Sequence, residues 1–416
     1  MRKLTALMML GLMLSSLAGG QVPNVPNAPT NKANEPMTTI SVPSGVHELT
    51  AVDVEAFLDG IVPLQLEQQD VAGATIAIVK DGKLFFSKGY GYADVKEKKP
   101  VVAEETLFRP GSVSKLFTWT AVMQLHEQGK LDLDRDVNEY LDFKIPEAFG
   151  QPVTMKNILT HTAGFEEQLK DFFAADKTNP NLGEYVKTHI PKRIFPPGTT
   201  PAYSNYATTL AGYIVERVSG QPFTEYVEQH IFKPLGMTRS TFVQPLPPEL
   251  APLMSKGYLL ASDEAQEFES ISLFPAGSMS SPATDIAKFM LAHLQEGRLG
   301  EAQILKPETV RLMHSRLFAL EPAANAMAYG FYEESRNGRR IIGHAGDTTQ
   351  FHSDLHLIPD AGLGFFISYN STGRGQISPR TILWEAFLDR YFPETPAIFR
   401  RSTARRKMPT SSAARI

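Results

Sequence analysis

The order of two apolar patterns along the chain constrains its fold more than any other feature. Strand-like patterns occur near both ends, at 75–79 and 84–90 and again at 328–333, 340–344, 352–358 and 363–369. The stretch between them, from about 112 to 274, is mostly helical in pattern. Strands from both ends can form one antiparallel sheet, so this order predicts an α+β fold with the helical stretch inserted as a second lobe. We expect a cleft between the sheet and the lobe.

Helical periodicity also indicates individual helices and their ends. Apolar spacing predicts helices over 52–66, 116–128, 209–218 and 381–391, with a turn at Asp81-Gly82 between the first two strands. Ser281 followed by Pro282 resembles an N-cap and first helical position, which predicts a further helix ending near Leu294.

Composition narrows the class of protein. The chain has 416 residues, a formal net charge of −4 and 42% hydrophobic residues, which suits a globular fold with a sizeable core. Neither a basic field nor an aromatic-basic pattern is present, so we expect no nucleic-acid partner. The chain has no cysteine, which excludes disulfides, a lipid-modified N-terminal cysteine, thiol catalysis and thiolate metal sites.

The two ends of the chain differ in composition from the middle. Arg2 and Lys3, an apolar stretch and then small residues predict a signal peptide over 1–20, followed by a flexible leader over 21–48. The folded domain is expected over 49–392, and 393–416 is expected to be a disordered basic tail. That tail is either simply solvated or in weak contact with an anionic cell envelope. We expect an exported protein, periplasmic or extracellular, with no transmembrane span in the mature chain.

A candidate nucleophile lies at the start of the helical stretch. Ser112-Val113-Ser114-Lys115 precedes an apolar run, which predicts that a helix starts here. Residues i and i+3 share a helix face, so the Lys115 amine can reach the Ser112 hydroxyl. A lysine shielded from water loses its proton more readily and can then accept one from the serine. An isolated match is more often an N-capping serine with a solvated lysine, so further motifs must decide.

Two further motifs supply groups for the same chemistry. Tyr203-Ser204-Asn205 lies in a stretch rich in Gly, Pro and Thr; a tyrosine hydroxyl can relay a proton, and an asparagine amide can bind an amine and a carbonyl. Gly343-His344-Ala345-Gly346 ends a predicted strand, and its glycines would let a substrate approach closely. Taken singly, these motifs also suit a buried tyrosine with a turn asparagine, and a strand end with a surface histidine.

Ser112-x-x-Lys115, Tyr203-x-Asn205 and His344-x-Gly346 occur together in the order and spacing of one known group. Over about residues 50–392 the chain resembles the penicillin-recognising serine hydrolases, which include class C β-lactamases, D-Ala-D-Ala carboxypeptidases, D-stereospecific peptidases and related esterases. Further similar stretches are Phe108-Arg109-Pro110-Gly111, 159–164 and Pro275-Ala276-Gly277-Ser278. The resemblance implies a β-lactamase/transpeptidase-like fold, with an antiparallel sheet flanked by helices.

The resemblance also implies a role for the residues of the helical side. Ser112 would be the nucleophile, and Lys115 and Tyr203 would be the proton-transfer pair. Asn205 would bind both Lys115 and the substrate. Neither a cofactor nor a metal is implied. Whether Lys115 or Tyr203 takes the serine proton stays open, because the two can titrate jointly.

The sheet side of the expected site departs from the family's pattern. His344, Gly346 and Asp347 would bind substrate at the sheet edge, and the backbone N–H of Asp347 would join that of the nucleophile in an oxyanion hole. Many β-lactamases have Lys-Thr-Gly where this chain has His344-Ala345-Gly346, so a fixed cation and a hydroxyl that hold a substrate carboxylate are missing. A histidine is only partly charged near neutral pH, and Asp347 adds negative charge.

These features predict an exported serine hydrolase that works through an acyl-enzyme on small amides, D-amino-acid peptides or esters. Substrates with a free carboxylate should bind less well, unless Arg339 or Arg340 on the same strand compensates. One alternative is a true β-lactamase or D-Ala-D-Ala carboxypeptidase. Another is a penicillin-binding sensor or scaffold whose acyl-enzyme never turns over.

Other chemistries lack their characteristic residues. The sequence has no H-E-x-x-H motif, no G-x-S-x-G nucleophile elbow and no P-loop. His352, Asp354 and His356 alternate along one predicted strand and share a face, which would suit a metal site. A polar sheet face explains the same pattern more simply, so we expect no metal.

Overall fold

The computed structural model of this chain describes residues 47–174 and 178–394. The predicted signal peptide over 1–20 lies outside these residues, as do nearly all of the predicted leader and tail. Within the described part of the chain, no helix is long and apolar enough to cross a membrane.

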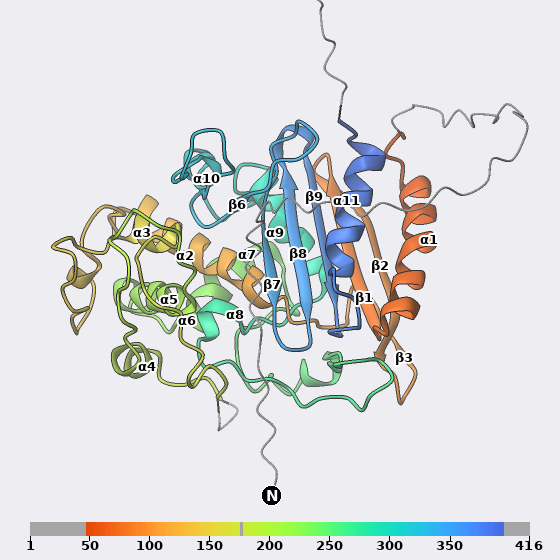
Figure 1. Ribbon diagram of the computed structural model, residues 1–416, viewed down its shortest axis with the longest axis horizontal. Helices are drawn as coiled ribbons and strands as arrows, with labels where there is room; N and C mark the ends of the chain where they lie inside the picture. The colour runs from red at the N-terminus through yellow and green to blue at the C-terminus, as the bar shows by residue number, and fades with distance from the viewer. Residues whose placement is uncertain (1–46, 175–177, 395–416) are drawn as a thin grey trace, which may run out of the picture. The chain divides into compact units, whose positions relative to one another are not determined.

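One antiparallel sheet lies at the centre of the fold, and both ends of the described chain contribute strands to it (Figure 1). Its strand order is β3-β2-β1-β9-β8-β7-β6. The strands are β1 (Gly73–Lys80), β2 (Lys83–Asp94), β3 (Lys99–Pro100), β6 (Tyr332–Glu333), β7 (Ile342–Asp347), β8 (His352–Ile358) and β9 (Leu363–Tyr369). β1 pairs directly with β9, with Ala74 opposite Tyr369. The predicted α+β fold with an antiparallel sheet is therefore confirmed.

Two strands begin later than predicted, although β8 and β9 match their predicted ranges. Only the last two residues of 328–333 form β6, because Gly330 turns the chain with a φ of +94° beside the Trp119 ring. A Cβ at Gly330 would lie 2.1 Å from that ring. β7 begins two residues late because a turn at Asn337-Gly338 precedes it, with positive φ at both residues.

Between β3 and β6 the regular structure of the described residues is helical apart from a small hairpin of β4 (Arg298–Leu299) and β5 (Ala302–Gln303), but turns and irregular segments make up more of the predicted helical stretch than helices do. The helices of this region are α2 (Lys115–Glu127), α3 (Met155–Leu159), α4 (Leu182–Thr188), α5 (Asn205–Ser219), α6 (Phe223–Val227), α7 (Lys233–Leu235), α8 (Phe274–Gly277), α9 (Ala283–Leu294) and α10 (Pro307–His314). Short 3₁₀ or π turns are η1 (Gly111–Ser114), η2 (Val137–Glu139), η3 (Glu228–Phe232), η4 (Ala251–Leu253) and η5 (Pro359–Ala361). α2 is buried on all sides over 115–125, as expected of a central helix.

The start of α9 differs from its prediction. Ser281 is not the N-cap, because Pro282 occupies that position and makes no side-chain cap bond. The Ser281 hydroxyl instead lies 2.8 Å from the Ser240 hydroxyl. The predicted end of this helix, near Leu294, is correct.

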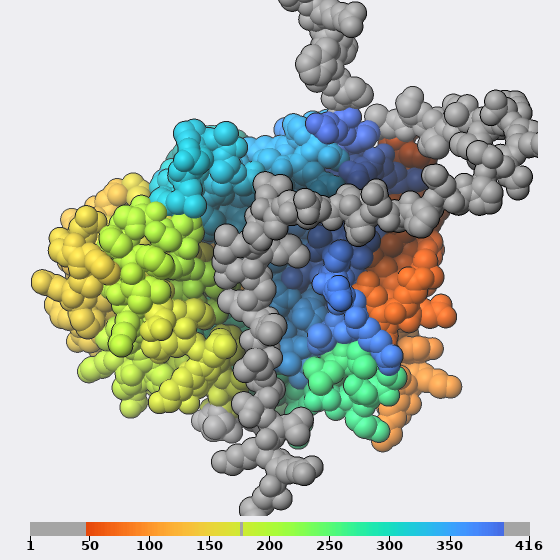
Figure 2. Space-filling model, in the orientation of Figure 1, coloured from red at the N-terminus to blue at the C-terminus, as the bar shows by residue number. Residues whose placement is uncertain are grey.

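Helices pack on both faces of the sheet. The side chains of β1 alternate, so Ala77 and Val79 join the core that contains α2, α5 and α9. Ile76 and Ile78 join a second core beneath α1 (Ala51–Gln69) and α11 (Pro379–Tyr391). α1 and α11 lie side by side, and Figure 2 shows them as adjoining red-orange and blue surfaces. Asp53 of α1 forms an ion pair with Arg390 of α11, with Oδ1 and Nη2 2.8 Å apart, and this pair joins the two helices.

Candidate active site

The Ser112 motif lies where the sheet meets the helical region. Gly111–Ser114 form one 3₁₀ turn, and α2 begins directly after it at Lys115. The Ser112 side chain caps neither helix. Gly111 has a φ of +54°, and a Cβ added to it would lie 2.6 Å from the backbone N of Asp347 in β7. Glycine is therefore required here, both for the turn and for the close approach of the sheet.

Lys115 is wholly buried, and its amine has three partners. Nζ donates to Ser112 Oγ at 2.9 Å, to Asn205 Oδ1 at 2.7 Å and to the Ala276 carbonyl oxygen at 2.7 Å. Burial lowers the pKa of Lys115 to about 7, against the opposing effect of the Glu167 carboxylate. At neutral pH much of this lysine is therefore a free amine, whose lone pair can face the Ser112 hydroxyl.

Tyr203 makes the second contact with Ser112. Its hydroxyl donates to Ser112 Oγ at 2.7 Å. Ser204 follows it and caps the first turn of α5, which fixes the place of the tyrosine at the helix start. Burial raises the pKa of Tyr203, and the Glu167 and Asp347 carboxylates add to this effect. The phenol therefore stays protonated at neutral pH, although 37% of the residue is exposed.

Asn205 links Lys115 to the carboxylate of Glu167, a residue that was not predicted to be part of the site. The Asn205 backbone N–H donates to Glu167 Oε2 at 2.9 Å, and its Nδ2 donates to Glu167 Oε1 at 2.8 Å. Because both carboxylate oxygens hold this one residue, the amide is oriented with Oδ1 toward Lys115. Burial raises the pKa of Glu167, and its bonds with Asn205 oppose that shift. The only sequence signal near it was the family-like stretch 159–164, which ends three residues earlier.

His344 lies in β7 but differs in charge from the prediction. It is 1% exposed, and its ring stacks on Tyr332 with centroids 4.4 Å apart. Its Nδ1 lies 2.5 Å from the Ala345 carbonyl oxygen. Burial and the neighbouring Lys115 lower the pKa of His344 to about 3. The expectation of a partly charged histidine near neutral pH is therefore wrong, because burial and the charge of Lys115 both disfavour the protonated imidazole.

Gly346 brings the edge of β7 against the nucleophile turn. A Cβ added to Gly346 would lie 1.9 Å from the Pro110 carbonyl oxygen and 2.8 Å from the backbone N of Ser112. The Cβ built on Gly111 meets Asp347 in the same way. The backbone N–H groups of Ser112 and Asp347, the expected oxyanion-hole donors, therefore lie on two segments in direct contact.

Comparison with known proteins identifies the family of this chain. A family model described as Beta-lactamase matches residues 55–386. The chain belongs to the beta-lactamase family. Protein flp of Staphylococcus aureus (strain N315) is 29% identical over 326 residues, which are 76% of this chain and 63% of the relative. A beta-lactamase of Pseudomonas fluorescens is 28% identical over 317 residues, 74% of this chain and 82% of the relative.

A solved structure shows the same fold. The octameric penicillin-binding protein homologue from Pyrococcus abyssi matches this chain with a TM-score of 0.69 and 26% sequence identity, over 81% of this chain and 77% of that one. The chain spans 63% of the length of the Protein flp relatives. The predicted family and its β-lactamase/transpeptidase-like fold are confirmed.

In this beta-lactamase family chain, the carboxylate of Asp347 is paired. Its Oδ1 lies 2.6 Å from His352 Nδ1 and 2.8 Å from Arg380 Nη1. Burial alone would raise the pKa of Asp347, but the bonds to His352 and the charge of Arg380 lower it to about 2. Asp347 is thus ionised, and the guanidinium offsets the negative charge that it was expected to add to the cleft.

The arginines predicted to compensate for the missing cation are engaged elsewhere. Arg339 forms an ion pair with Asp360 at 2.8 Å, and Arg340 forms one with Glu333 at 2.7 Å. Both residues precede β7, which begins at Ile342, so neither is on the strand as predicted. The arginine that reaches the site edge is Arg380 of α11, which no sequence motif indicates.

The alternating residues of β8 lie mostly beneath α11. Asp354 and His356 are buried, and the His356 ring stacks on Trp384 of α11 with centroids 4.1 Å apart. Arg380 Nε lies 3.4 Å from the Asp354 carboxylate. Across residues 47–174 and 178–394, no group of three His, Asp or Glu side chains is arranged to hold a metal ion.

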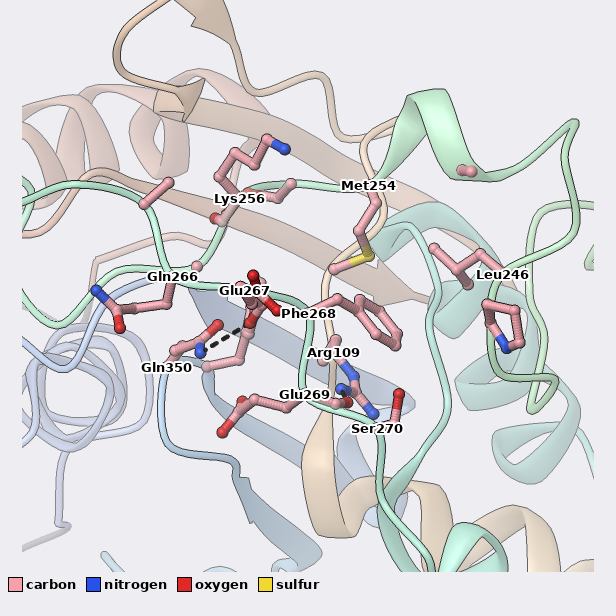
Figure 3. Close-up of a pocket in the computed structure, with 16 residues that line it drawn as sticks. Arg109, Leu246, Met254, Lys256, Gln266, Glu267, Phe268, Glu269, Ser270 and Gln350 are labelled. Carbon is pink, nitrogen blue, oxygen red and sulfur yellow. Dashed lines mark hydrogen bonds between the residues drawn. The ribbon is translucent and has the colours of Figure 1, made fainter. Parts of the chain in front are cut away.

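A separate cavity of about 580 Å³ adjoins the family-like stretch before Ser112 (Figure 3). Arg109 lines it, with its guanidinium 4.4 Å from the ring centroid of Phe268. The same guanidinium donates to Gln244 Oε1 at 3.1 Å and to the carbonyl oxygen of Glu269. Arg109 thus anchors the chain that leads into the nucleophile turn, and Ser112, Lys115 and Tyr203 do not line this cavity.

Proposed function

We propose that this chain is an exported serine hydrolase that acts on small neutral esters, amides or D-amino-acid peptides. The substrate would acylate Ser112, and water would then release the acyl group. The Ser112 hydroxyl oxygen lies 2.9 Å from a buried lysine amine and 2.7 Å from a tyrosine hydroxyl. Such an arrangement activates a serine without a histidine base.

The charges of the two groups favour Lys115 as the base. Its pKa of about 7 makes the free amine abundant at neutral pH, whereas the Tyr203 phenol keeps its proton. Ser112 Oγ would bond to the substrate carbonyl carbon as its proton moves to Lys115 Nζ. The leaving group would then depart with a proton from the Tyr203 hydroxyl, and Tyr203 would take up the proton that Lys115 holds, so that both groups return to their starting states. Water would hydrolyse the acyl-enzyme by the reverse proton path.

Negative charge that develops on the substrate oxygen needs donors at the same place. The N–H groups of Ser112 and Asp347 lie on the segments in contact at Gly111 and Gly346. They would form the oxyanion hole. Asn205, held by Glu167, would keep the Lys115 amine directed at Ser112.

The charges around the site support neutral substrates. His344 is uncharged at neutral pH, and Ala345 has no side-chain donor. Arg339, Arg340 and Arg380 each hold a carboxylate of this chain. The P. fluorescens relative is named a beta-lactamase, which keeps β-lactam hydrolysis as the second candidate.

A substrate panel tests the proposal. We expect fluorophosphonate labelling of the wild-type protein, and a kcat/KM for p-nitrophenyl butyrate that exceeds that for a close analogue with a free carboxylate by about tenfold or more. A chromogenic cephalosporin and D-amino-acid p-nitroanilides complete the panel. Preference for the cephalosporin over every neutral ester would establish the β-lactamase alternative. Stable labelling by penicillin without turnover of any substrate would establish the sensor.

Restoring the missing groups should change this preference. Converting His344 to lysine and Ala345 to threonine should raise kcat/KM for the cephalosporin relative to the ester by about 10- to 100-fold, because each charge-assisted contact contributes about 1.5–3 kcal/mol at most. Val52→Lys, an added charge at an 80% exposed position of α1, is the matched control. An equal gain in both variants would argue against a specific carboxylate contact. Wild type itself should not shift toward the cephalosporin at pH 6, since His344 stays neutral there.

The pKa of Lys115 also predicts the pH profile. If the free amine is the base, kcat/KM for a neutral ester should rise about tenfold per pH unit below 7 and level off above it, because deprotonation of Lys115 near pH 7 creates the active form. Initial rates between pH 5 and 9 measure this directly. A profile that is flat from pH 5 to 8 would exclude Lys115 as the titrating base.

A further inference from the structure

Arg380 of α11 contacts the backbone of the proposed oxyanion hole from the far side of β7. Its Nη1 donates to the carbonyl oxygens of Gly346 and Ser353, each at 2.9 Å. Its Nη2 donates to Asp347 Oδ2 at 3.0 Å. Gly346 and Ser353 are directly opposite each other in the β7–β8 pair, so one guanidinium bridges both strands. The side chain is 12% exposed.

The geometry of one peptide group connects this contact to the site. The Gly346 carbonyl and the Asp347 N–H belong to the same peptide, and a planar trans peptide points these two groups in opposite directions. A bond that holds the carbonyl toward Arg380 therefore holds the N–H away from it. On that side the chain meets Gly111, whose added Cβ would lie 2.6 Å from the Asp347 nitrogen.

The pairing of Gly346 with Ser353 already ties this peptide to β8, and Arg380 adds a second contact to the same carbonyl. No residue other than glycine fits at position 346, since any Cβ would lie 1.9 Å from the Pro110 carbonyl oxygen. Glycine is also the residue that resists backbone rotation least. The close approach that the site requires thus places the most freely rotating residue type in this peptide, where the contact with Arg380 restricts it further.

We propose that Arg380 is a positioning residue that orients the Asp347 N–H for the oxyanion. This inference rests on the proposed function of Ser112. A cation at the carbonyl end also polarises the peptide, which makes its N–H a stronger donor. Asp347 and Asp354 hold the guanidinium in place at 2.8 Å and 3.4 Å. The arginine would act through the backbone and would not touch the substrate.

Arg380→Gln and Arg390→Gln form a matched pair of variants. Both arginines are on α11 and both form ion pairs, but Arg390 contacts Asp53 of α1. We expect Arg380→Gln to lower kcat for p-nitrophenyl butyrate about 10- to 100-fold, less than the roughly 10²–10³-fold loss of a whole donor, with little change in KM. A boronic acid that forms a tetrahedral adduct should lose affinity by the same factor. Arg390→Gln should retain both properties.

Chemical rescue separates orientation from folding. If Arg380→Gln is too unstable to assay, Arg380→Ala with and without added guanidinium ion, at a non-denaturing concentration, carries the same test. Recovery of kcat by guanidinium supports the proposal, and no recovery in a folded variant overturns it. Equal kcat losses in the two glutamine variants, or a lower kcat with unchanged boronic acid affinity, would also overturn it. Wild type that fails to label with fluorophosphonate would instead refute the proposed function itself.

Discussion

Replacing Ser112 with alanine should abolish labelling by a fluorophosphonate probe and lower kcat/KM for p-nitrophenyl butyrate about 10⁵–10⁶-fold, the loss expected when the nucleophile of a covalent mechanism is removed. The reason is geometric. Ser112 Oγ is the oxygen that both Lys115 Nζ and the Tyr203 hydroxyl contact. A water in its place would lack the fixed orientation of the side chain.

Ser114→Ala is the matched control for this experiment. Ser114 is two residues away in the same turn, but its hydroxyl donates to the Gly111 carbonyl oxygen at 2.5 Å and contacts neither Lys115 nor Tyr203. It should retain labelling. Ser112 caps no helix, so Ser112→Ala should change the melting temperature by only about 2–4 °C. Labelling of Ser112→Ala at the wild-type rate would show that the nucleophile lies elsewhere.

The features that could be predicted from sequence are those set by local spacing or by strong patterns. The antiparallel sheet followed from alternating segments near both ends of the chain, and β8 and β9 occupy their predicted ranges. The contact between Ser112 and Lys115 could be predicted because residues three positions apart lie on the same face of a helix. Tyr203, Asn205 and His344 could be brought to the same site only through family resemblance, because their separations along the chain carry no geometry.

The features that could not be predicted depend on contacts between distant segments. Glu167 binds Asn205 from 38 residues away, and Arg380 reaches Gly346 from 34 residues away, each without a local motif. The charge state of a side chain could not be predicted for the same reason. Nothing in the sequence around His344 indicates that the ring is buried against Tyr332, or that this burial and the charge of Lys115 lower its pKa to about 3. Arg339 and Arg340 were the nearer arginines in sequence, yet turn geometry and two carboxylates hold them elsewhere.

Removing either partner of Ser112 should slow acylation by orders of magnitude. We expect Lys115→Met and Tyr203→Phe each to lower kcat/KM about 10²–10⁴-fold, the usual contribution of a positioned acid or base. Methionine fills the space of the buried lysine without an unpaired amine, and phenylalanine keeps the ring. Tyr206→Phe is the control, because this neighbouring tyrosine donates to the Val186 carbonyl oxygen at 2.8 Å, away from Ser112. It should retain wild-type kcat/KM.

The double variant decides whether the two groups act as one relay. Both hydrogen-bond to the same oxygen. In the proposed relay Lys115 takes the proton of Ser112, Tyr203 gives one to the leaving group, and Lys115 then restores the proton of Tyr203. Once one member is lost, the other has no step left to assist, and the combined loss should be close to the larger single loss. Single-turnover acylation by a D-amino-acid p-nitroanilide, whose amine must leave with a proton, gives the coupling directly when it is measured for all four proteins. Losses that multiply in full would mean that Lys115 and Tyr203 serve separate steps, and that Tyr203 does not recover its proton from Lys115.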